Sequence, residues 1–255
     1  NTFRDCDGHC VRWGILFSDT VGPERGYYAI CNDNVFEDVG NDAILMEINA
    51  RYVTVQGNIG HRIRSLIKVH ASSASPPYAH QFSIMGNIAV GQIVAASDGT
   101  SRGACIKVET ASENAMIHGN IVDGFEVGIQ GGTGASVVGN TVRGATGTAA
   151  IRLLGERSLA SHNIISGGAA TWAIWATTKN KVDGNDITNT GGGIRAEGAR
   201  IRVSGNRVSC SGAGVFITSD AVSSIITGND LLDVAGTKIS NAAGASVVQA
   251  NNIIA

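Results

Sequence analysis

The chain has 255 residues, 43% of them hydrophobic and 16% charged, a composition that excludes a disordered protein and favours an ordered one with a substantial core. The formal net charge of -2 gives no bulk attraction to nucleic acid or to a membrane surface, and no apolar run approaches the roughly 20 residues that span a bilayer. We therefore expect no nucleic-acid partner and no membrane insertion.

A short phrase with a glycine before an asparagine recurs from one end of the chain to the other. Clear copies are VTVQGNI at 53–59, AMIHGNI at 115–121 and IRVSGNRV at 201–208. Such a period, of about 22 residues, is typical of a solenoid. The glycine suits a left-handed turn, and the asparagine tolerates that conformation or bonds to its copy in the next coil. The marker asparagines are Asn34, Asn58, Asn87, Asn120, Asn140, Asn163, Asn185, Asn206, Asn229 and Asn251.

A second signal alternates with the first and is usually a small residue followed by a β-branched one. Around it, apolar and polar residues alternate with period two, which predicts strands with one buried face. A unit of this length without helical periodicity predicts a stack of about ten coils of parallel strands. The residues predicted to face the interior are Ile15, Ile44, Ile67, Ile106, Ile129, Ile151, Ile174, Ile194, Val215 and Ile239.

On these repeats the chain resembles the right-handed parallel β-helix proteins of the pectate-lyase-like superfamily. The resemblance implies an all-β fold, a right-handed single-stranded parallel β-helix, as a single domain over residues 1–255. Because Asn1 already lies within a repeat, we expect these residues to be a fragment of a longer chain.

The superfamily includes polysaccharide lyases, glycoside hydrolases, uronan epimerases and phage tailspike depolymerases. The resemblance therefore implies a polysaccharide as partner and an extracellular or virion-associated location. It also implies a homotrimer, which is common among tailspikes of this fold. No cofactor is expected, apart from the calcium that related lyases use.

Five cysteines do not form a recognisable disulfide framework. The stretch CDGHC at 6–10, with Cys31 one coil later, offers thiol and imidazole groups, but its spacing matches no standard zinc module. We predict no metal site, and we expect Cys105 and Cys210 to be core or turn residues.

The residue after each inward position belongs to an outward column. Large apolar rings such as Trp175 and Phe216 lose free energy in water unless something covers them. Sugars stack on such rings, and cations bind the carboxylates of an acidic glycan. The alternatives are a solvated strip and a contact with another subunit. The residues predicted to bind substrate are Lys68, Lys107, Gln130, Arg152, Trp175, Arg195 and Phe216.

Three insertions, near 18–28, 71–81 and 91–103, occur in the N-terminal coils. Two follow the strand that carries the outward column and one precedes it, so we expect them to wall a groove on that face.

The predicted groove floor carries the candidate catalytic residues Glu47, His70 and Glu109. The two glutamates lie two coils apart, about 9.6 Å, and carboxylates at roughly that separation suit inverting hydrolysis, with His70 between them. The same groove suits β-elimination from a uronate, with Lys68, Lys107 or His70 as the base. The sequence thus favours a polysaccharide-cleaving enzyme, a glycoside hydrolase or a lyase. The alternatives are a non-catalytic glycan-binding or receptor-binding module and a structural spacer of a fibre.

Overall fold

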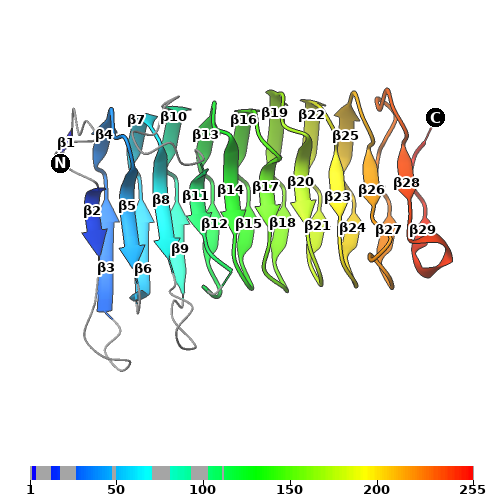
Figure 1. The fold of residues 1–255 in the computed structure, drawn as a ribbon, viewed down its shortest axis with the longest axis horizontal. Helices are drawn as coiled ribbons and strands as arrows, with labels where there is room; N and C mark the ends of the chain where they lie inside the picture. Colours follow the sequence, from blue (N-terminus) through cyan, green and yellow to red (C-terminus); the bar gives the residue numbers. More distant parts are fainter. Residues whose placement is uncertain are drawn as a thin grey trace.

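The computed structural model describes residues 2–3, 13–17, 27–47, 50–70, 81–92, 103–110 and 112–254. Within these residues the chain forms three parallel sheets that run the length of one elongated solenoid, with the termini at opposite ends (Figure 1). The predicted all-β parallel β-helix is confirmed. Among the described residues no helix is long and apolar enough to cross a membrane.

Each turn of the solenoid contributes one strand to each sheet in the order A, B, C. Sheet A contains β1 (Thr2–Phe3), β4 (Val35–Glu37), β7 (Ile59–Ile63), β10 (Ile88–Gln92), β13 (Ile121–Asp123), β16 (Thr141–Ala145), β19 (Ile164–Gly168), β22 (Asp186–Thr190) and β25 (Arg207–Cys210).

Sheet B carries the predicted outward column. It contains β2 (Trp13–Phe17), β5 (Asp42–Glu47), β8 (Ser65–His70), β11 (Ala104–Val108), β14 (Val127–Gly131), β17 (Ala149–Leu153), β20 (Trp172–Ala176), β23 (Ile194–Ala196), β26 (Val215–Ile217) and β28 (Ile239–Asn241).

Sheet C completes each turn. It contains β3 (Tyr27–Asn32), β6 (Ala50–Gln56), β9 (Phe82–Met85), β12 (Met116–His118), β15 (Ser136–Val138), β18 (Leu159–Ser161), β21 (Lys181–Asp183), β24 (Arg202–Ser204), β27 (Ile225–Thr227) and β29 (Val248–Ala250). A short 3-10 helix, η1 (Gly244–Ser246), precedes β29. The last turn contributes β28 to sheet B and β29 to sheet C, but among the described residues it contributes no strand to sheet A. The solenoid therefore has slightly fewer complete turns than the predicted ten.

The register of sheet B agrees with the prediction in every described strand. Each predicted inward residue pairs with the next one, from Ile15 with Ile44 to Val215 with Ile239. The spacing of 39 residues from Ile67 to Ile106 is the longest between successive inward residues, and these two residues are nevertheless direct neighbours. The inward residues from Ile44 to Val215 are fully buried in one continuous apolar core.

The glycine–asparagine phrase forms the corner between sheets C and A, with the glycine in the left-handed turn and the asparagine bonded to its copy in the next coil, as predicted. The residue before each ladder asparagine takes the left-handed conformation, as at Gly57 (φ 67°) and Gly139 (φ 63°). In one coil His162 (φ 53°) occupies this position instead. The ladder asparagines themselves are not left-handed, and their side chains turn into the interior.

Asn140 illustrates the bonding of a ladder residue. Its backbone N–H and its side-chain amide both donate to Oδ1 of Asn163, each at 3.0 Å, and the amide also donates to the carbonyl of Ile117 at 2.8 Å. Its own Oδ1 accepts two bonds from Asn120 at 2.9 Å. Buried backbone groups at this corner therefore find partners in the neighbouring coils.

The final ladder residue is Asn252, and the predicted Asn251 is wrong. Oδ1 of Asn252 accepts from the backbone and the side chain of Asn229, at 3.0 and 2.9 Å. Asn251 instead has φ 53° and occupies the left-handed position that glycine holds elsewhere. Of two adjacent asparagines, the backbone geometry selects the second for the ladder.

Candidate functional site on the outer face of sheet B

The seven residues predicted to bind substrate form one unbroken column across β8, β11, β14, β17, β20, β23 and β26. Each is the direct cross-strand partner of the next, which places neighbouring side chains about 4.8 Å apart along the solenoid. The column is Lys68, Lys107, Gln130, Arg152, Trp175, Arg195 and Phe216.

Trp175 lies between two arginines at the centre of the C-terminal part of this column. The guanidinium carbon of Arg152 is 5.2 Å from the centroid of the Trp175 ring, and that of Arg195 is 4.6 Å from it. At these distances both cations are attracted to the electron-rich ring faces. The stacks hold the three side chains in a fixed order along the sheet.

Several nitrogen atoms of this stack are buried without a hydrogen-bond partner among the described residues. They are Nε of Arg152, Nε of Arg195 and Nε1 of Trp175. Burial also lowers the pKa of the Arg152 guanidinium, an effect that the charge of Glu126 partly offsets. Because these atoms are buried, a ligand cannot reach them, and contact with a ligand falls to the terminal nitrogens of the two partly exposed arginines.

Two of the predicted cations have carboxylate partners two residues further along the chain, directly after the end of each strand. Lys107 Nζ lies 3.0 Å from Oε1 of Glu109, and the Arg195 guanidinium lies 2.8 Å from Oε2 of Glu197. Arg152 forms no such ion pair within the described part of the chain. On this face Lys107 and Arg195 therefore have carboxylate partners, whereas Arg152, which lies between them in the column, has none among the described residues.

Trp172 belongs to the same surface and was missed in the sequence. Its ring lies 5.4 Å, centroid to centroid, from the ring of Phe216, at an interplanar angle of 30°. Trp172 precedes the inward residue Ile174 by two positions, where simple alternation predicts an inward side chain. Ala173 and Ile174 both contribute to the core, so the alternation is interrupted and Trp172 faces outward.

Asp42 is a second residue that the sequence did not single out. Its carboxylate is 9% exposed and lies 3.8 Å from Nζ of Lys68. Burial raises the pKa of Asp42, and this effect outweighs the opposing charges of Lys68 and Arg64. Asp42 stands two residues before an inward isoleucine, and the equivalent residues of the next two coils are the smaller Ser65 and Ala104. A single aspartate at this position was the signal in the sequence that could have revealed it.

The predicted catalytic residues lie on neighbouring strands in the expected order. Glu47 pairs with His70 across β5 and β8, and the backbone N–H of Glu109 donates to the carbonyl of Val69 at 3.2 Å. The side-chain positions of Glu47 and His70 lie outside the described residues, so their catalytic roles stay a prediction.

Most of each predicted groove wall also lies outside the described residues, at 18–26, 71–80 and 93–102. The boundaries shift slightly, because Tyr27 and Tyr28 belong to β3 and Gly91 and Gln92 belong to β10. The floor is thus defined by β5, β8 and β11, while the walls remain an expectation.

The cysteines support no metal site in the described part of the chain. The Cys31 thiol is buried and accepts a hydrogen bond from the Asn34 amide at 3.4 Å. Burial is the main reason that its pKa rises to about 11. Cys105 and Cys210 are buried as predicted, and burial raises their pKa values too. Cys6, His9 and Cys10 lie outside the described residues. Within the described residues, no group of three or more His, Cys, Asp or Glu side chains could hold a metal ion.

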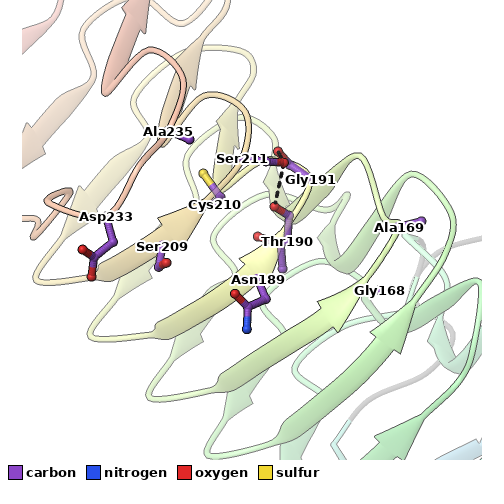
Figure 2. Close-up of a pocket in the computed structure, with 10 residues that line it drawn as sticks. All are labelled: Gly168, Ala169, Asn189, Thr190, Gly191, Ser209, Cys210, Ser211, Asp233 and Ala235. Carbon is purple, nitrogen blue, oxygen red and sulfur yellow. Dashed lines mark hydrogen bonds between the residues drawn. The ribbon is translucent and has the colours of Figure 1, made fainter.

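A separate hollow of about 540 Å³ lies where β22 and β25 turn from sheet A towards sheet B (Figure 2). Two of its three hydroxyl groups already have internal partners: Thr190 donates to the Gly192 carbonyl at 3.0 Å, and Ser211 donates to the Gly191 carbonyl at 3.3 Å. Asp233 is its one charged lining residue. The hollow lacks the cations and rings that distinguish the face of sheet B.

Comparisons with known proteins place the fold. No curated protein sequence matches the chain. A solved structure of a mutant of the periplasmic alginate epimerase AlgG is similar with a TM-score of 0.60 at 15% identity, covering 90% of this chain and 51% of that one. PfbA, a surface adhesin of Streptococcus pneumoniae, is similar with a TM-score of 0.55 at 14% identity, covering 84% of this chain and 63% of that one.

This chain therefore spans about half the length of the epimerase. At these identities the structural similarity concerns the fold alone. The sequence itself matches the family described as the right handed beta helix region over residues 104–254. The chain belongs to this right-handed β-helix family.

Proposed function

We propose that the outer face of sheet B binds an acidic polysaccharide that lies along the solenoid axis, across β8 to β26. The observation that carries this proposal is the partly exposed stack of Arg152, Trp175 and Arg195. A guanidinium binds a carboxylate through two parallel hydrogen bonds, and an indole ring offers an apolar face to a sugar. Cations beside an aromatic surface suit a sugar that carries an acidic group.

The repeat of the solenoid supports a chain-like ligand. Each coil adds one position of the column at intervals of about 4.8 Å, a spacing close to the length of one pyranose in an extended polysaccharide. Successive sugars can therefore meet successive positions from Lys68 to Phe216. A compact ligand would use only one or two of them.

The comparisons agree with this proposal. One similar structure is an alginate epimerase of the periplasm and another is a surface adhesin, so the fold serves proteins that act on a polysaccharide or at a cell surface. We accordingly propose a location outside the cytoplasm for this chain, in the periplasm, outside the cell or on a virion.

Catalysis at the N-terminal end of the same face is a second candidate function. Asp42 favours it, because its raised pKa keeps a buried carboxyl protonated at a higher pH than usual, beside the cation of Lys68. A protonated acid can donate a proton to a leaving oxygen, and a neighbouring cation can neutralise a uronate. We propose Asp42 beside Lys68 as one candidate acid, and Glu47, His70 and Glu109 as a separate candidate cluster about 16 Å away, at the other end of these strands; either would serve hydrolysis or β-elimination.

Affinity electrophoresis in gels that contain either a polyuronate or a neutral polysaccharide tests the binding proposal. We expect retardation by the polyuronate alone, reduced in Trp175→Ala. The matched control is Tyr52→Ala, which removes an aromatic side chain 44% exposed on sheet C and should bind as the wild type does. Equal migration in all gels would contradict the proposal.

Digestion of the same polymers tests catalysis separately. New reducing ends without ultraviolet absorbance at the band of an unsaturated uronate would indicate hydrolysis, and the absorbance would indicate elimination. The product should be lost in Asp42→Asn if the acid beside Lys68 is catalytic, and in Glu109→Gln if the cluster at the other strand end is, while gel retardation persists in both variants. Retardation without any product would leave a binding module and remove the enzymatic proposal.

A further inference from the structure

The outer face of sheet A carries an apolar column on its N-terminal strands. The first outward residue of each strand from β4 to β19 is apolar in five of six coils, and the four isoleucines are 37 to 52% exposed. In β22 and β25 the same position holds Asp186 and Arg207. The apolar stretch is thus confined to one part of the sheet. The column is Val35, Ile59, Ile88, Ile121, Thr141 and Ile164.

A second outward column lies two residues further along the same strands. In five successive coils it holds an acid, a base, an apolar residue, an acid and a base. Read from its centre at Val90, each acid on one side stands as far away as a base on the other side. The column is Glu37, His61, Val90, Asp123 and Arg143.

The edge of this face is low in the central coils. Gly91, Gly124 and Gly144 follow the second column in successive turns, each with positive φ. Glycine has no side chain beyond the backbone, so these three described residues project no side chain beside the column. A flat surface can approach the two columns from that side.

We propose that a second copy of this chain docks antiparallel on this face, related by a two-fold axis that runs parallel to β10. The axis places Ile88 and Val90 opposite their own copies and Ile59 opposite Ile121 of the second copy. It also places Glu37 opposite Arg143, a residue of opposite charge, and His61 opposite Asp123, whose carboxylate can accept a hydrogen bond from the imidazole. Two-fold symmetry forms each of these contacts twice.

The common pitch of the two copies keeps this arrangement in register. Both present side chains at intervals of about 4.8 Å, so exposed isoleucines can meet in register over five coils, a length on the order of 20 Å. Few other surfaces have this spacing. The pattern therefore favours another copy of the same solenoid as the occupant.

A parallel arrangement fits the charges less well. If two or three copies met on this face with their axes parallel, equal coils would lie side by side, bringing Glu37 to Glu37 and Asp123 to Asp123. Like charges brought together in an interface are unfavourable. The order of charges on sheet A thus favours the antiparallel pair over the homotrimer that the family resemblance implies. Sheet B is left open, so this inference does not depend on glycan binding.

Sedimentation equilibrium over a range of protein concentrations tests the proposal. We expect a dimer for the wild type and a monomer for Arg143→Glu, which faces Glu37 of the second copy with a like charge. Combining Arg143→Glu with Glu37→Lys should restore the dimer. Ile225→Lys, at a residue 43% exposed on sheet C, is the control and should stay dimeric. A wild-type monomer at every concentration, or a trimer, would overturn the proposal.

Cross-linking with a short bis-maleimide tests the position of the axis. Ile88→Cys places the introduced thiol opposite its own copy, and sheets that pack face to face stand about 10 Å apart, a gap that such a reagent spans, so this variant should give a covalent dimer above the wild-type background. Ile164→Cys lies three coils from the axis and should give none. Equal cross-linking of both variants would mean a parallel arrangement and would refute the two-fold axis at β10.

Discussion

The interior asparagine ladder and the outer column of sheet B each place one residue per coil, yet they differ in content. The ladder is asparagine in every coil that contains it, whereas the outer column changes from Lys68 to Gln130 to Trp175. The interior position must satisfy buried backbone groups, for which the asparagine amide is suited in every coil. The outer position does not have to satisfy buried backbone groups, so its residues can differ from coil to coil and suit a ligand.

The largest effect is expected from breaking the interior ladder at its middle. Asn140→Ala removes the acceptor of two Asn120 donors and a donor to the Ile117 carbonyl. Each buried group left unpaired costs about 1 to 3 kcal/mol, so the free energy of unfolding should fall by roughly 3 kcal/mol or more. Urea unfolding measures it. Asn252→Ala, at the less buried end of the ladder, should lose clearly less, and an equal loss would contradict this account.

The next largest effect is expected on the outer column, and it should concern binding rather than stability. Trp175→Ala removes the ring that both arginines flank and should weaken polyuronate binding about tenfold, or about 1.4 kcal/mol. Phe216→Ala should weaken binding less, because that ring also packs on Trp172. Calorimetric titration measures both. A loss of stability without a loss of affinity would make Trp175 a packing residue.

A further effect is expected from a change that tests only the left-handed backbone conformation at the corner between sheets C and A. At Gly139 an added Cβ meets no atom within 4 Å, so Gly139→Ala tests only the left-handed conformation, which costs an L-residue about 1 to 2 kcal/mol. The reverse change, His162→Gly at the matching position of the next coil, relieves that strain but removes the hydrogen bond between Ser161 Oγ and His162 Nδ1, so stability should change little. Thermal unfolding of the two variants compares them, and equal losses would show that side-chain contacts decide.

The smallest effect concerns pH and Asp42. Because burial raises the pKa of Asp42 in the folded state, the carboxyl favours folding in its protonated form, and that advantage is lost as the pH rises through the raised pKa. Relative to Asp42→Asn, the wild type should therefore lose stability from pH 3 to pH 7. Urea unfolding at both values measures the difference. A relative gain would mean that the Lys68 ion pair dominates.

The register of the fold was predictable because burial with period two leaves few ways to stack the coils. The inward isoleucines and the column from Lys68 to Phe216 follow directly from that rule. That rule does not reveal Asp42 and Trp172 as residues of the outer face, because two consecutive residues, such as Ala173 and Ile174, both enter the core at the turn into sheet B. The ion pair of Lys107 with Glu109 was open to prediction, since residues two apart share one face of a strand.

The ladder shows where sequence patterns reach their limit. Asn251 and Asn252 are adjacent and chemically identical, and only the left-handed backbone at Asn251 decides which of them bonds to Asn229. The unfilled donors of the arginine–tryptophan stack are likewise a matter of geometry, because no pattern of residues reveals which nitrogen lacks an acceptor.

The most direct test of the central claim is a titration of a purified oligouronate into three proteins at low and moderate salt. These are the wild type, Arg152→Gln with Arg195→Gln, and Arg202→Gln with Arg207→Gln, which removes the same charge from sheets C and A. We predict that the first pair of changes weakens binding at least tenfold and that the second leaves it unchanged. Equal weakening by both pairs, or by neither, would contradict binding on the outer face of sheet B.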